Sequence, residues 1–204
     1  MKKFELTTES ITNAAGKKLF RIKALVEFGD VKAGELGGYV EKEGNVSQDG
    51  NAWVSGNAWV YDNAWVYGNA RVYDNARVCG DARVYGNARV CGDARVFGNA
   101  RVFGDAWVSG DAWVYGNARV SGDAWVSGDA DYTLIQGFGT EFRCTTFYRG
   151  KNKKIMVNCG CFHGDLEGFR KQVKETRSGK IAKEYLMIAD LMEYHFASED
   201  SDDE

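Results

Sequence analysis

The chain has 204 residues, of which 44% are hydrophobic and 27% are charged, and its net charge is −3 at pH 7. This length predicts one elongated body with a small appended domain. There is no run of about 20 apolar residues that could span a membrane, the start lacks the apolar run of a signal peptide, and the negative charge argues against general nucleic-acid binding. The five cysteines lack the density of a secreted disulfide framework, so we expect a cytoplasmic protein that does not bind membranes.

Residues 1–36 are predicted to form a small β-rich cap. Segments 4–7 and 19–26 have the composition of strands, and Asn13 to Gly16 between them favour a turn. A cap suits the repeat that follows, because the first coil of a solenoid would otherwise expose an unpaired strand edge and an open apolar end.

Residues 37–131 are predicted to form a β-helix. Valine stands at every sixth position from Val54 to Val126, and alanine precedes each valine by two residues. Because a period of six fits neither the helical period of 3.6 nor a long strand, each unit is predicted to be a short strand and a turn. Three units would make one triangular coil, giving about five coils with valine and alanine inside and the Gly, Asn and Asp residues at the corners.

The six-residue register can be extended upstream of the regular units. In this extension Val40 and Val46 occupy the alanine position, and Lys42 and Gln48 stand where valine stands in later units. We therefore expect the first coil to continue the same spacing.

The valine and alanine pattern resembles the hexapeptide-repeat family, whose members form left-handed parallel β-helices and are often homotrimers. Many enzymes of that family transfer acyl groups from coenzyme A, using a histidine base and a loop inserted into the repeats. Here His163 and His195 both lie beyond the repeat, and residues 50–130 contain no inserted loop. We therefore predict no catalytic residues and no cofactor, and we keep acyl transfer as an alternative.

A narrower resemblance lies at the start of the repeat. Residues 28–41, which lead into residues 50–54, are similar to a group of phage and prophage proteins. The resemblance implies that the protein works in the cytoplasm of a host cell, but it does not imply a mode of action.

Residues 132–197 are predicted to form a small α+β domain. Segments 142–148 and 154–158 have the alternation of a hairpin around Gly150. Two amphipathic helices follow, the first with Asp165 as its N-cap and the second after Gly179. Residues 198–204 are acidic, and we expect a disordered tail.

A candidate metal site lies in this domain. Two thiols and an imidazole within five residues could bind zinc if a cysteine on the facing strand supplied a fourth ligand. The spacing lacks the paired pattern of a zinc ribbon, and packing of the cysteines in the core is the favoured interpretation. The candidate ligands are Cys144, Cys159, Cys161 and His163.

The outer surface of the repeat provides the candidate interface. Residues beside each valine should point outward and should stack between coils, and on one side of the triangle they form an aromatic and guanidinium patch. The patch consists of Trp65, Tyr67, Arg83, Tyr85, Arg101, Phe103 and Arg119. We favour its burial in a homotrimer. The alternatives are simple ladders of arginine on aromatic rings, or a ligand surface for single-stranded nucleic acid or nucleotides, whose binding the neighbouring aspartates would oppose.

We therefore expect a non-enzymatic binding protein of the phage type. The solenoid would be a trimeric scaffold, and the terminal domains would bind a host protein or a nucleotide signal, as a counter-defence inhibitor or a sequestering protein does. The alternatives are an acetyltransferase and a structural virion or assembly component.

Overall fold

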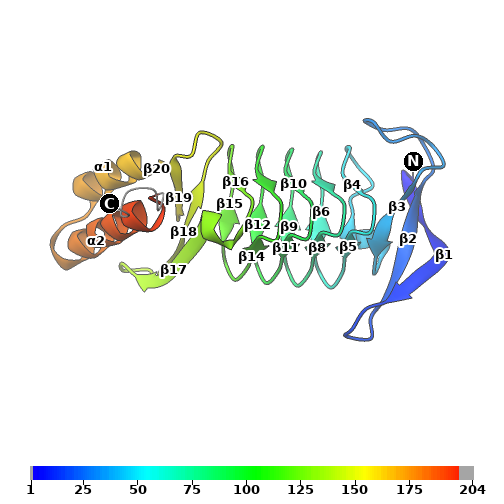
Figure 1. Cartoon of the computed structure of the whole chain (residues 1–204), viewed down its shortest axis with the longest axis horizontal. Helices are drawn as coiled ribbons and strands as arrows, with labels where there is room; N and C mark the ends of the chain where they lie inside the picture. The colour runs from blue at the N-terminus through cyan, green and yellow to red at the C-terminus, as the bar shows by residue number, and fades with distance from the viewer. Residues whose placement is uncertain (1, 198–204) are drawn as a thin grey trace, which may run out of the picture.

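The computed structural model describes residues 2–197. The molecule is elongated, and a stack of coils separates an N-terminal cap from a C-terminal α+β domain (Figure 1). The predicted acidic tail, residues 198–204, lies outside the described residues.

The cap consists of strands β1 (Phe4–Thr12), β2 (Lys18–Ala24) and β3 (Leu36–Val40). The three strands are antiparallel, and β3 then pairs in parallel with β5 of the solenoid, so the cap and one side of the solenoid share a sheet. The predicted turn is present, because Asn13 Oδ1 accepts hydrogen bonds from the backbone N–H groups of Ala15 and Lys17.

The predicted parallel β-solenoid is confirmed, with about five turns. Each strand is two residues long and is made of one outward tryptophan or arginine and one inward valine. The strands are β4 (Trp53–Val54), β5 (Trp59–Val60), β6 (Trp65–Val66), β7 (Arg71–Val72), β8 (Arg77–Val78), β9 (Arg83–Val84), β10 (Arg89–Val90), β11 (Arg95–Val96), β12 (Arg101–Val102), β13 (Trp107–Val108), β14 (Trp113–Val114), β15 (Arg119–Val120) and β16 (Trp125–Val126).

Each strand pairs with the strands one coil above and below it. Val66 pairs with Val84, and Val84 pairs with Val102, so one coil takes 18 residues and the strands form three parallel sheets. The valines of β4 to β16 and the alanines that precede them are at most 1% exposed. At about 1.5–3 kcal/mol per buried large apolar side chain, the valine column supplies much of the driving force for folding.

The corners need left-handed backbone angles. The corner glycines have positive φ, and Asp62 and Asp74 adopt φ values of 61° and 60° at the same place. Successive corners also touch, since a Cβ on Gly86 would lie 2.9 Å from the backbone N of Gly104. Glycine therefore serves both the turn and the close stacking of coils.

The register predicted for the first coil is wrong by two residues. Val40 pairs with Val60 and Val46 forms a bridge with Val66, so both occupy the valine position. Gln48 does not stand in a valine position. Its amide instead accepts a hydrogen bond from Lys3 N at 2.7 Å and donates one to the carbonyl of Phe4 at 3.2 Å. The irregularity arises because this segment binds the cap as well as the next coil.

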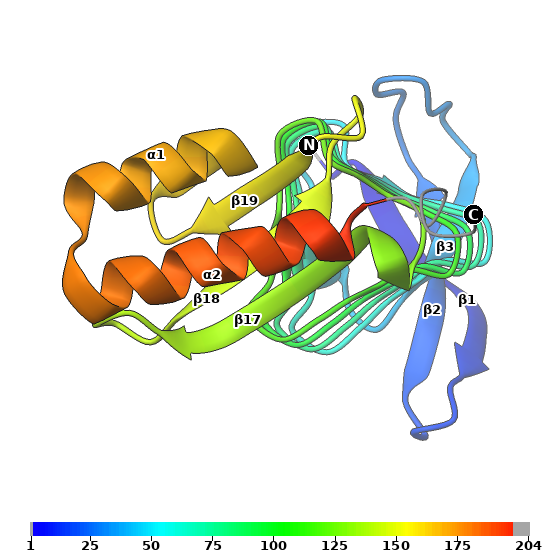
Figure 2. The ribbon, with the colours of Figure 1, turned by 60° about the vertical axis from the view of Figure 1, so that its left-hand side comes forward.

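The C-terminal domain begins after a short 3₁₀ turn, η2 (Asp129–Asp131). Its antiparallel sheet contains β17 (Tyr132–Phe138), β18 (Arg143–Arg149), β19 (Ile155–Cys159) and β20 (Phe162–Asp165), and two helices follow, α1 (Leu166–Thr176) and α2 (Gly179–His195). The helices pack on one face of the sheet and the last coil lies against the other (Figure 2).

The predicted hairpin is the pair β18 and β19, and both predicted helices are confirmed. The Asp165 carboxylate accepts a hydrogen bond from Gly168 N at 2.9 Å, as expected of an N-cap. The sheet is wider than the predicted hairpin, because β17 and β20 flank it. The strand β20 is too short to show an alternation of polar and apolar residues, since it contains only four residues, Phe-His-Gly-Asp.

Polar side chains close the N-terminal end of the solenoid. The buried Asn45, in the 3₁₀ turn η1 (Glu43–Asn45), donates from its amide to the carbonyls of Asp62 and Ala64 at 3.1 and 2.8 Å. Lys3 donates from its ammonium group to the carbonyl of Ala52 at 3.0 Å. These side chains replace the donors that another coil would supply.

The C-terminal end is closed in the same way. Arg119 lies on the last strand of its sheet, where its N–H donates to Thr146 Oγ1 at 3.0 Å and its carbonyl accepts from the Asn158 amide at 2.8 Å. The Asn158 amide also lies 3.1 Å from both the Ser121 and the Tyr148 hydroxyls. Two side chains of the α+β domain thus satisfy the polar backbone of the last strand.

Candidate interaction surface

A continuous stack of aromatic rings runs along one side of the solenoid. The rings of Trp65 and Tyr67 have centroids 4.1 Å apart, those of Tyr67 and Tyr85 lie 4.7 Å apart, and those of Tyr85 and Phe103 lie 4.9 Å apart. The last two pairs are nearly parallel, with interplanar angles of 6° and 3°. The repeat places equivalent residues one above another in successive coils, and this register produces the stack.

A column of arginines lies beside the rings. In the sheet of β6, β9, β12 and β15, Trp65 pairs with Arg83, and Arg83 with Arg101, which in turn pairs with Arg119. We call the rings and these arginines together the aromatic–arginine face. It consists of all seven residues predicted from the sequence: Trp65, Tyr67, Arg83, Tyr85, Arg101, Phe103 and Arg119.

The guanidinium groups of this face are less engaged than those of the other two sides. On the side of β5, β8, β11 and β14, Arg77 lies over the Trp59 ring at 4.4 Å, and Arg95 lies over the Trp113 ring at 4.7 Å. On the third side, Arg89 lies over the Trp107 ring at 5.7 Å. Within residues 2–197, Arg83 and Arg101 form neither a cation–π contact nor an ion pair, and Arg119 makes only a long hydrogen bond of 3.4 Å to the Gly160 carbonyl. Three guanidinium groups therefore lie one above another, and none of them forms an ion pair with a carboxylate of the described residues.

The face is open to solvent. Trp65 is 40% exposed, Arg83 and Arg119 are exposed, and the rings of Tyr85 and Phe103 are half-buried by stacking. Burial raises the pKa of the Tyr67 hydroxyl, and the neighbouring Arg83 and Arg101 oppose that rise. A surface with exposed aromatic rings and unpaired guanidinium groups has the composition of an interface core.

Not every outward tryptophan reaches solvent. Trp53 points out of its coil as predicted, but it is only 1% exposed because Phe4 and Phe28 of the cap pack edge-on against its ring, at 6.2 and 5.4 Å. Trp113 and Tyr115 on another side are 41% and 46% exposed, so aromatic rings are exposed there as well.

The four candidate metal ligands are not brought together. Strand alternation places Cys159 toward α1 and α2, whereas Cys144 and His163 belong to the opposite face of the sheet. The His163 imidazole lies against Gly122 of the solenoid, and Cys161 is exposed in the turn before β20. In the described part of the chain, no three His, Cys, Asp or Glu side chains gather as metal ligands would.

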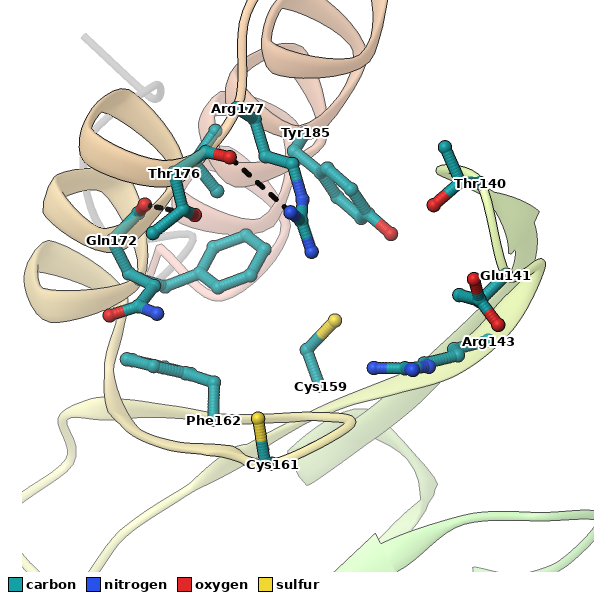
Figure 3. Close-up of a pocket in the computed structure, with 12 residues that line it drawn as sticks. Thr140, Glu141, Arg143, Cys159, Cys161, Phe162, Gln172, Thr176, Arg177 and Tyr185 are labelled. Carbon is teal, nitrogen blue, oxygen red and sulfur yellow. Dashed lines mark hydrogen bonds between the residues drawn. The ribbon is translucent and has the colours of Figure 1, made fainter.

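Sequence reasoning missed a cavity of about 80 Å³ in the C-terminal domain (Figure 3). It lies between the helices and the sheet, and its lining includes Arg143, Arg177, Cys159 and Tyr185. Arg143 and Arg177 are far apart in the sequence and belong to no recognisable motif, so only the packing of the domain reveals that they share a site.

The repeat matches a protein-family model described as the YdcK beta solenoid repeat. The matched segments are residues 64–80, 76–92, 82–96, 94–110 and 112–128. These segments lie within the solenoid and cover less than half of the chain, so they support a β-solenoid of repeated units. No curated protein matches the chain. No helix of the described residues is long and apolar enough to cross a bilayer.

Proposed function

We propose that this chain is a non-enzymatic binding protein whose solenoid is a rigid scaffold, assembled as a homotrimer through the aromatic–arginine face. The observation that supports the proposal is the difference between the three sides. On this side the guanidinium groups of Arg83 and Arg101 are unpaired beside a ring stack that begins at the exposed Trp65, whereas Arg77 and Arg95 on another side are already stacked on indoles.

Charge complementarity supports self-association. The corners carry exposed aspartates, including Asp81, Asp93 and Asp105, and none of these forms an ion pair within the described residues. In a trimer, the arginine column of one copy would meet corner carboxylates of its neighbour, while the rings of both copies would be removed from water. Arginine and carboxylate pairs of this kind fix the register of an interface.

The target that we propose is suggested by the resemblance to phage and prophage proteins of the hexapeptide-repeat type, which does not itself give a mode of action. We propose that the terminal domains bind a host protein or a nucleotide signal in the host cytoplasm, so that the protein acts as a counter-defence inhibitor or a sequestering protein. The repeat from Val54 to Val126 has constant 18-residue pairing without an inserted loop, which favours a scaffold over an acyltransferase.

Sedimentation velocity of the purified chain tests the assembly. We expect a trimer for the native chain and a monomer for the double variant Tyr67→Ser/Tyr85→Ser. The matched control is Tyr115→Ser, which removes an exposed ring from another side and should leave the trimer intact. A native chain that sediments as a monomer would contradict the proposal, as would equal effects of the two changes.

Affinity purification from host lysate tests the target. The full chain is immobilised, and retained proteins and small molecules are identified by mass spectrometry. Specific retention of one host protein or one nucleotide is expected. The absence of any retained species, together with incorporation of the chain into purified virions, would instead identify a structural component.

A further inference from the structure

We propose that the cavity between the two helices and the C-terminal sheet binds a phosphate monoester group, which Arg143 and Arg177 hold from two sides. This site lies outside the aromatic–arginine face and does not depend on trimer formation.

The two arginines reach the cavity from different elements. Arg143 is the first residue of β18, and Arg177 is the C-cap of α1. Figure 3 shows the Arg177 guanidinium above the Cys159 thiol and the Arg143 guanidinium directed toward Cys159 from the side, with Gln172 and Tyr185 around the same space. The site therefore brings two cations together with polar groups, one of which is the Glu141 carboxylate.

Neither cation is neutralised by the chain. Within residues 2–197, neither Arg143 nor Arg177 forms an ion pair, and the guanidinium of Arg177 donates only to the neighbouring carbonyl of Thr176 at 3.3 Å. Glu141 lies on the same rim without pairing with either arginine, so it would weaken the binding of an anion but does not occupy the site.

The turn beneath Arg143 leaves room for its guanidinium group. Gly160 has a φ of +63°, and a Cβ built on it would lie 2.6 Å from Arg143 Nη1. A side chain at this position would make the guanidinium group shift. The positive φ favours glycine here, and glycine also leaves space for the cation.

Part of the remaining wall is aromatic. The Phe162 and Phe169 rings lie 5.6 Å apart, and Tyr185 packs edge-on against Phe169 at 5.8 Å. The Tyr185 hydroxyl donates to the carbonyl of Phe138 at 3.2 Å, which fixes the ring. Charged hydrogen bonds are stronger beside such walls than in open water.

The size and the donors of the cavity favour phosphate. A volume of about 80 Å³ holds a few water molecules, so it can enclose one phosphate group while the remainder of a ligand stays outside. Guanidinium groups bind phosphate oxygens in a bidentate manner, and a tetrahedral phosphate can engage two guanidiniums approaching from two directions. Cys159 and Cys161 provide only two thiols, which are too few for a tetrahedral zinc site.

Calorimetric titration of the full chain with inorganic phosphate tests the site, with sodium chloride at equal ionic strength as the reference. We expect saturable binding that weakens about tenfold or more in Arg143→Gln and in Arg177→Gln, because each change removes a charge-assisted contact. Glu141→Gln should strengthen binding. Arg77→Gln, which makes the same charge change on the solenoid outside the aromatic–arginine face, should leave the affinity unchanged.

A second measurement uses only the native chain. Cys161 lines the cavity, so phosphate should slow its alkylation. Cys144 does not line the cavity, and the rate of its alkylation should stay the same. The proposal is overturned if the native chain shows no saturable binding, if Arg77→Gln weakens binding as much as Arg177→Gln, or if phosphate protects neither thiol or both equally.

Discussion

Replacement of Asn158 by leucine tests how the α+β domain closes the solenoid. The amide donates to the Arg119 carbonyl at 2.8 Å and lies 3.1 Å from the Ser121 and Tyr148 hydroxyls. Leucine has a similar volume but no donor. The two hydroxyls are 3.4 Å apart and can bond to each other, so the Arg119 carbonyl is the group left without a partner.

An unsatisfied buried carbonyl costs about 1–3 kcal/mol, and a cost of about 2 kcal/mol lowers the Tm of a chain of this size by about 4–8 °C. We expect that decrease in Asn158→Leu by circular dichroism, together with faster amide exchange in β15. The control is Asn69→Leu, whose amide lies at an exposed corner and donates to the Asn87 side chain. A change of less than about 0.5 kcal/mol is expected there. If Asn158→Leu is as stable as the native chain, the amide does not replace the missing coil.

Two further predictions concern the corners and two tyrosines with raised pKa values. Gly86→Ala should lower the free energy of unfolding by about 2 kcal/mol or more, because a left-handed angle and a close contact with Gly104 coincide. Gly16 also has a positive φ, but a Cβ there would meet no atom within 4 Å, so Gly16→Ala should lower the free energy of unfolding only by the cost of the backbone angle. Urea unfolding measures both variants, and equal losses of stability would contradict the argument from the contact with Gly104. Burial raises the pKa of Tyr73 to about 12 and also raises the pKa of Tyr148. An unfolded tyrosine titrates near 10, so this stability is fully present below about pH 10 and is lost as pH rises toward about 12. Unfolding midpoints that stay constant over that range would refute the prediction.

The regular part of the fold was predictable because each unit repeats the same physical solution. Val84 and Ala82 are buried for the same reason as every other valine and alanine of the repeat, and the stacking of Tyr67 on Tyr85 follows once the coil length is known. One period therefore determined the core, the corners and the aromatic–arginine face.

The ends of the repeat were not predictable from that period. Gln48 departs from the register because its amide binds the backbone of the cap, and Trp53 is covered by Phe28, which belongs to the connection before β3. These are contacts between segments of different kinds, and no spacing in the sequence encodes them. The cavity beside Arg143 and Arg177 was missed for the same reason.

The division of each coil into three six-residue units has a consequence for changes in chain length. Each unit builds one side of the triangle. Deletion of a single unit would therefore rotate the C-terminal domain by one side of the triangle relative to the cap. Deletion of three units would keep both ends in the same orientation and would shorten the body by one strand spacing, about 4.8 Å. Length and orientation can thus be varied separately, and only multiples of 18 residues preserve the alignment of the two terminal domains.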